Sequence, residues 1–198
     1  YTYKSLFSVR KVQTTSSWRH LFFIYPAFVL IALTGVESCF KLMAKYCHGK
    51  THVAFKAALA FFIVISFLST SIFMVRYHPY QNVYFNCLAG KSMQEVKDNF
   101  DLDYWGLSYR QALEYIIQND KGENIKVFDA IDSASLANNI KILPVDDRGR
   151  ISQVISPDDA KYIITNYRWH KQDYTYPIEF FSINVGNAKI LSVFRLKA

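Results

Sequence analysis

Two long apolar runs, residues 21–40 and 57–75, constrain this chain more than any other feature. At 1.5 Å per residue, a run of about 20 residues makes a helix about 30 Å long, which matches the hydrocarbon core of a bilayer. The second run carries no charge, and its twelve Leu, Ile, Val, Phe and Met residues contribute about −4 to −7 kcal/mol to insertion. Each run is therefore predicted to be a transmembrane helix. A hydrophobic hairpin inside a large soluble protein is the disfavoured alternative, because such long uncharged runs seldom occur in soluble cores.

The charges around these runs predict an orientation. The loop formed by residues 41–56 carries four lysines, two histidines and no acid, so the positive-inside rule places it in the cytoplasm. Residues 1–20 also carry four bases, and only the brevity of the loop and the few bases after the second run favour this assignment. Residues 1–20 and 76–198 would then both lie outside the cytoplasm. The net charge of +7 does not indicate nucleic-acid binding, because many of the bases flank the runs.

The residues at the ends of the runs have two interpretations. Trp18, Arg19 and His20 directly precede the first run, where Trp anchors at the membrane interface and Arg extends to the headgroups. Alternatively, Arg19 and His20 contact a lipid-linked phosphate at the helix N-terminus.

The segment after the second run, residues 76–90, is rich in aromatic residues and lacks acids. This composition is typical of a segment at the membrane interface, and Arg76, His78 and Tyr80 are its candidate interface residues.

Residues 76–198 are predicted to form one mixed α/β domain. Helical periodicity and a possible cap at Ser108 predict a helix over residues 109–119, and a second helix is expected over 133–140. Short β-rich runs predict strands at 125–128 and 162–165, with a charged turn at 144–149. Residues 156–159 are either a helix start or a turn, and the β-rich run that follows favours the turn. Gly186 and Asn187 separate two strand-like runs and predict a β-hairpin.

The sequence FDLDYWG contains the candidate binding residues of the domain: Asp101, Asp103, Tyr104 and Trp105. Carboxylates accept sugar hydroxyls and aromatic rings stack on a sugar face, although paired carboxylates in a turn more often satisfy backbone groups. No nucleophile elbow, P-loop, dinucleotide fingerprint or zinc-protease motif is present in the sequence, and the three cysteines have no metal or disulfide spacing. We therefore predict neither a metal site nor a cofactor.

Three ordered motifs resemble a known family: WRHLFFIYP at 18–26, HPYQNVYFN at 78–86 and FDLDYWGLSY at 100–109, with SVFR at 192–195. They resemble bacterial GT-C type membrane glycosyltransferases similar to dolichyl-phosphate-mannose protein mannosyltransferases. Asp101 stands where that pattern has Glu, which keeps the charge. The resemblance covers residues 18–115 best.

The resemblance implies an inner-membrane enzyme that transfers a sugar from a polyprenyl-phosphate carrier to a glycan, lipid or protein acceptor on the periplasmic side. Its catalytic acid is expected in an N-terminal extracytoplasmic loop, so no catalytic residue is assigned in this chain. Because the sequence begins with Tyr1, we expect it to be the C-terminal part of a longer polypeptide with further spans. The alternative is a non-catalytic membrane-tethered domain that binds a partner protein.

Overall fold

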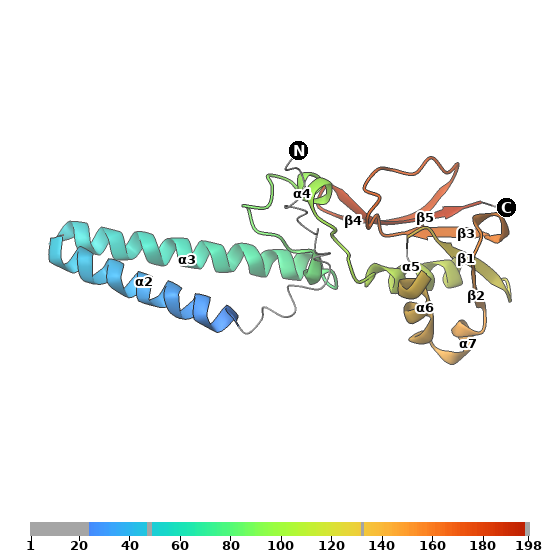
Figure 1. The fold of residues 1–198 in the computed structure, drawn as a ribbon, viewed down its shortest axis with the longest axis horizontal. Helices are drawn as coiled ribbons and strands as arrows, with labels where there is room; N and C mark the ends of the chain where they lie inside the picture. Colours follow the sequence, from blue (N-terminus) through green and yellow to red (C-terminus); the bar gives the residue numbers. More distant parts are fainter. Residues whose placement is uncertain (1–23, 47–48, 132, 197–198) are drawn as a thin grey trace, which may run out of the picture. The chain divides into compact units, whose positions relative to one another are not determined.

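The computed structural model describes residues 24–46, 49–131 and 133–196, and these divide into two compact units between Ile65 and Ser66. The first contains helix α2 (Tyr25–Tyr46) and the first part of helix α3 (Lys50–Arg76). The second contains the end of α3 and a mixed α/β domain (Figure 1). The predicted order of two long apolar helices followed by a small α/β domain is confirmed.

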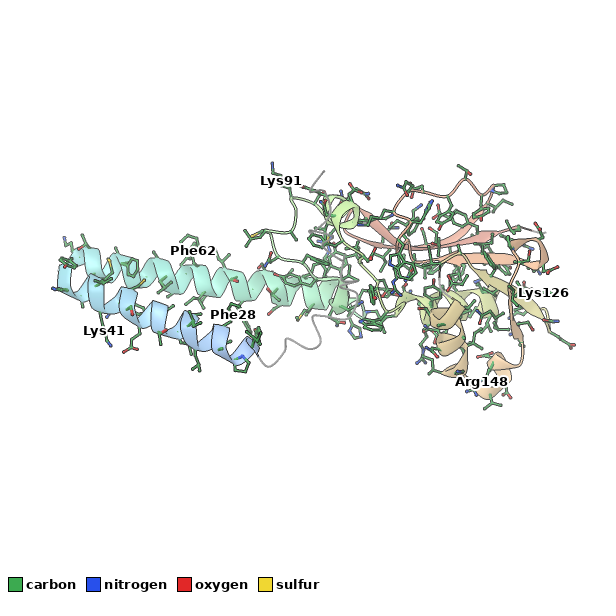
Figure 2. All side chains as sticks on the ribbon, viewed as in Figure 1. Phe28, Lys41, Phe62, Lys91, Lys126 and Arg148 are labelled. Atoms are coloured by element: carbon green, nitrogen blue, oxygen red, sulfur yellow. The ribbon has the colours of Figure 1, made fainter. Side chains whose placement is uncertain are left out.

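Helices α2 and α3 have 22 and 27 residues, and none of their side chains is buried. Phe28 and Phe62, labelled in Figure 2, are 65% and 69% exposed. Within the first unit the rings of Phe40 and Phe55 meet edge to face, with centroids 6.3 Å apart. Both helices are long and apolar enough to cross a membrane, which suggests membrane association.

The helices extend beyond the apolar runs, so most of the predicted loop at 41–56 is helical. Helix α2 continues to Tyr46 and α3 begins at Lys50, because Ala, Lys, Leu and Met favour helix and need no apolar surroundings. Gly49, with φ 64°, precedes α3 in the left-handed conformation. At the other end Pro26 lies in the first turn of α2, where its missing N–H breaks no helical bond. Residues 21–23 of the first run lie outside the described residues.

The α/β domain is built on a five-stranded mixed sheet in the order β2-β1-β3-β5-β4. Strands β1 (Ile125–Asp129), β2 (Ile151–Val154) and β3 (Tyr162–Thr165) are parallel, with Ile125 opposite Ile151 and Val127 opposite Tyr162. Strands β4 (Glu179–Val185) and β5 (Ala188–Arg195) form the predicted hairpin around Gly186 and Asn187. Because β3 pairs with β5 in the antiparallel sense, the hairpin completes the sheet on one side of the parallel strands.

Helices α5 (Ser108–Asn119) and α6 (Ser133–Lys141) pack against the sheet, α5 on β4 and β5 and α6 on β1 and β2. The apolar face of α5 is fully buried at Ala112, Leu113 and Ile116, as its periodicity predicts. The helices at 109–119 and 133–140 and the strands at 125–128 and 162–165 are confirmed within one residue. Ser108 is the first residue of α5 instead of its cap.

Several short elements were not predicted from the sequence. They are α4 (Met93–Asn99), capped by Ser92, strand β2, and the 3-10 helix η2 (Gln81–Val83). Residues 156–159, predicted as a turn with a helix start as the alternative, contain the 3-10 helix η3 (Pro157–Asp159). The predicted charged turn at 144–149 contains one helical turn, α7 (Val145–Arg148). Such elements are too short for their apolar residues to show a period.

The aromatic segment at 76–90 belongs to the core of the domain rather than to its surface alone. Val83 is fully buried, and Tyr80 is 6% exposed with its hydroxyl donated to Gln111. Tyr84 packs its ring on Phe73 near the end of α3, at a centroid distance of 5.1 Å. The ring of Tyr80, a predicted interface residue, is therefore covered by protein, and its hydroxyl contacts α5. Aromatic composition alone does not distinguish these two environments.

Candidate functional site

Two loops meet at the carboxyl end of strand β3, the edge where open α/β sheets commonly bind ligands. We call them the 100–107 loop, which precedes α5, and the 166–178 loop, which connects β3 to β4. The buried side chain of Asn166 donates to the backbone carbonyl of Asp103 at 2.8 Å. The backbone N–H of Trp169 donates to Asp101 Oδ1 at 3.3 Å. These two bonds hold the loops together.

Asp103 is the structural centre of the 100–107 loop. Its side chain is 1% exposed and accepts the N–H groups of Leu107 (3.0 Å) and Ser108 (2.9 Å), and also the Ser108 hydroxyl. The side-chain amide of Asn82 donates to the same carboxylate at 3.3 Å. The carboxylate thus satisfies N–H groups at the start of α5, where negative charge is favoured by the helix dipole. With its oxygens engaged in this way, Asp103 supports the site and does not face a ligand.

Gly106 permits the close packing of this loop. Its φ of 66° is in the left-handed region, and a Cβ there would lie 3.0 Å from Tyr109 Cδ2 and 3.2 Å from Ser135 Cβ. Its carbonyl accepts the side chain of Asn139 at 3.0 Å. Only glycine adopts this left-handed conformation readily and also leaves room for Tyr109 and Ser135.

An aromatic and cationic cluster covers the junction of the loops. The guanidinium of Arg168 lies 3.7 Å from the ring centroid of Tyr104 and 4.1 Å from that of Trp169. Tyr104 in turn meets Trp105 edge to face at 5.1 Å. The two tryptophan side chains remain 59% (Trp105) and 63% (Trp169) exposed. Exposed aromatic rings held beside a cation can stack on the apolar face of a sugar.

The backbone of the 166–178 loop is strained at this point. Tyr167 and Trp169 have φ values of 59° and 63°, in the left-handed region that costs a residue with a Cβ about 1–2 kcal/mol. Asn166 and Asp101 supply the hydrogen bonds that hold this conformation. Strain retained in a loop with an exposed tryptophan marks it as a functional candidate.

Other aromatic residues of the 166–178 loop have a structural role. Tyr174 and Tyr176 pack their rings on Phe194 of β5, with centroids 6.2 and 5.2 Å away. Tyr167 is buried, and its hydroxyl lies 2.7 Å from Ser192 Oγ. Burial raises the pKa of Tyr167 to about 12, so this hydroxyl stays protonated at neutral pH. These tyrosines pack on strand β5, whereas the ring of Trp169 is exposed.

A polar pocket of about 690 Å³ lies beside this cluster, between α4, the 166–178 loop and the β4–β5 turn. Trp169 lines it together with three lysines, Lys97, Lys171 and Lys189. The ammonium group of Lys97 lies 3.6 Å from the ring centroid of Tyr167, and its side chain is almost fully buried. Burial lowers the pKa of this lysine. The remaining walls are mostly amide and carboxylate side chains.

The structure brings together three of the four residues predicted from FDLDYWG. Tyr104 and Trp105 belong to the aromatic cluster, and Asp101 joins it through Trp169, whereas Asp103 points into the protein. Arg76 and His78 are exposed at the end of α3 and just after it, and His78 bonds Gln81 at 2.6 Å. The predicted residues Trp18, Arg19 and His20 lie outside the described residues.

Sequence reasoning missed the 166–178 loop and α4. A signal was present, because NYRWH directly follows a buried β-strand, where a cluster of aromatic and basic residues is unusual. Within the described part of the chain, no group of three or more His, Cys, Asp or Glu side chains is placed to hold a metal ion. The arrangement is suited to binding a polar ligand.

Comparisons with known proteins identify no relative of this chain. Neither the models of protein families, nor the curated proteins, nor the solved structures contain a match to it.

Proposed function

We propose that this chain is the C-terminal portion of an integral-membrane glycosyltransferase, which transfers a sugar from a polyprenyl-phosphate carrier to an acceptor outside the cytoplasm. Helices α2 and α3 span the bacterial inner membrane with residues 41–56 towards the cytoplasm, and the α/β domain lies in the periplasm. The observation that carries the proposal is a cluster beside a polar pocket, in which Arg168 contacts Tyr104 and Trp169 and Tyr104 contacts Trp105. Both tryptophans are exposed. The cluster is formed partly by the motif that resembles the family.

In this proposal the domain binds the acceptor, and an N-terminal part of the enzyme performs the chemistry. Trp105 and Trp169 stack on the acceptor's sugar rings, and the Asp101 carboxylate keeps Trp169 in place. Arg19 and His20 contact the carrier phosphate, which stays a prediction because both lie outside the described residues. Each of these residues acts in binding and none in bond cleavage.

The test is a transfer assay with the natural gene product that contains residues 1–198. Membrane vesicles receive a polyprenyl-phosphate-linked radiolabelled sugar, and transfer to an extractable acceptor is measured. Trp105→Ala and Trp169→Ala are each expected to lower kcat/KM for the acceptor by about tenfold. The decrease is expected to come from a higher KM, with kcat unchanged. Lys126→Gln, at the exposed β1 site labelled in Figure 2, is the matched surface control.

Two outcomes would overturn this proposal. A natural product with no transfer activity, or one encoded without further apolar spans upstream of residue 1, would exclude the enzyme. Arg19→Ala is expected to raise KM for the carrier alone, and unchanged kinetics would leave Arg19 as a membrane anchor.

A second candidate function is a membrane-tethered domain that binds a partner protein. It is favoured by the exposure of Leu107 (52%) next to the two exposed tryptophans, because exposed apolar and aromatic groups are typical of protein interfaces. Crosslinking from a photoreactive residue at Leu107 separates the two functions. A single protein adduct in intact cells supports the tether, whereas adducts to glycan or lipid support the transferase.

A further inference from the structure

We propose that the pocket between α4 and the 166–178 loop binds an acidic saccharide, with Lys97 receiving its anionic group and Trp169 stacking on its ring. This inference rests on the proposed function only in taking a saccharide as the ligand. It places the saccharide in the pocket beside the aromatic cluster, with Trp169 shared between the two, and it assigns a charge to that ligand.

Lys97 lines the pocket as a buried cation. Its side chain is 4% exposed, and its ammonium group lies over the ring of Tyr167. Among the described residues no carboxylate forms an ion pair with it. The ammonium group has this cation–π contact and the longer-range attraction of Asp173 and Asp98, and an anion entering the pocket would supply a direct partner.

The other charged groups of the pocket are already engaged or lie at its rim. Lys189 pairs with Glu179 at 2.8 Å, and Lys171 donates to the backbone carbonyl of Asp98 at 3.1 Å. The Asp98 carboxylate accepts the side-chain amide of Gln94 at 2.9 Å. Asp173 is exposed and can accept a sugar hydroxyl. Lys97 is therefore the cation best placed to select an anion.

The walls of the pocket are mostly polar. Amide side chains, including those of Gln172, Asn184 and Asn187, provide donors and acceptors suited to hydroxyl groups. Trp169 adds an exposed ring, and its strained backbone is held by Asp101. The volume of about 690 Å³ is within the range of small-ligand sites and has room for more than one sugar ring. A ligand with many hydroxyl groups and an anionic group fits these amide walls, the ring of Trp169 and the ammonium group of Lys97.

The experiment is isothermal titration calorimetry on the full chain in a detergent without sugar headgroups. The probes are trigalacturonate, its neutral methyl ester, a hexose phosphate and inorganic phosphate. We expect trigalacturonate or the hexose phosphate to bind, and which of them binds more tightly identifies a carboxylate or a phosphate as the anionic group. The methyl ester is expected to bind at least about tenfold more weakly than trigalacturonate if the group is a carboxylate.

Three variants locate the binding. Lys97→Gln is expected to weaken binding of the preferred probe about tenfold, Lys97→Arg to retain most of it, and Lys126→Gln to change it less than about twofold. Circular dichroism checks that each variant is folded. If Lys97→Gln does not fold, Trp169→Ala replaces it, with a similar loss expected.

The proposal is overturned if neither acidic probe binds, if the preferred probe binds no better than inorganic phosphate, or if a folded Lys97→Gln binds like the parent chain. Binding is measured without transfer. A failure here therefore leaves the transferase proposal standing, and a failed transfer assay leaves this site standing.

Discussion

The two units of this chain place the same kinds of side chain in opposite surroundings. Ile63 in α3 is 60% exposed, whereas Ile164 in β3 is fully buried. The described residues of α2 and α3 include no buried side chain, while the α/β domain buries its apolar residues between helices and sheet. The exposed apolar surface of the long helices suggests membrane association, whereas the domain makes its own apolar interior.

The largest expected effect comes from the same substitution made in both units. Ile164→Ala removes buried methyl groups and leaves a cavity, so we expect the domain to lose about 2–5 kcal/mol of unfolding free energy. Ile63→Ala is expected to change insertion by less than about 1 kcal/mol. Urea unfolding followed by circular dichroism in micelles measures the first, and a membrane-insertion assay the second. Equal destabilisation of the domain by both variants would contradict the comparison.

A charge in the middle of α3 tests its apolar surroundings directly. Ile63→Arg is expected to disfavour insertion by about 3 kcal/mol, because an arginine at the centre of a membrane helix must be solvated in hydrocarbon. Resistance to alkaline extraction from membranes is the measurement, and Ile63→Leu is the control. If Ile63→Arg remains as firmly bound to membranes as the control, α3 does not span a bilayer.

Buried polar side chains also distinguish the α/β domain from helices α2 and α3. Asp103→Asn keeps the side-chain shape but turns one acceptor into a donor facing Ser108, so we expect a loss of about 1.5–3 kcal/mol. Asp101→Asn, which is only partly buried, is the matched control and is expected to stay within about 0.5 kcal/mol. Urea midpoints of the two variants make the comparison. A larger loss for Asp101→Asn would mean that Asp103 is not the structural centre of its loop.

Sequence alone predicts the helix pair well and the domain in outline. An apolar run identifies a long helix without any knowledge of its neighbours, although the ends of α2 and α3 extend past the runs because lysine and alanine also favour helix. The hairpin at Gly186 and the strand at 162–165 have strong local signals. Strand β2 has none, since it is defined by its pairing with β1.

The candidate site shows why functional residues were only partly predictable. Tyr104 and Trp105 are evident in their motif, but whether a carboxylate is exposed depends on donors from elsewhere in the chain, such as Asn82 for Asp103. The pocket joins α4, the 166–178 loop and the β4–β5 turn, which are far apart in sequence. Lys97 has no local signal at all, because its burial arises from packing against Tyr167.

The smallest expected effect is on the stability of the α/β domain, and it occurs only at alkaline pH. Burial raises the pKa of Tyr80, Tyr162 and Tyr167 from the ordinary value of 10.0 to about 12. Below pH 10 these hydroxyls are protonated in both the folded and the unfolded chain. As pH rises from 10 towards about 12 the unfolded chain releases protons first, so the stability of the domain falls across this window.

Tyrosinate absorbance during a pH titration measures the ionisation of these three tyrosines. Tyr80→Phe is expected to remove one late-titrating hydroxyl while keeping the ring. If all tyrosines of the folded chain ionised together near pH 10, the domain would lack the dry interior that distinguishes it from the helix pair. Late ionisation that disappears in urea would show that the interior is made by folding of the domain itself.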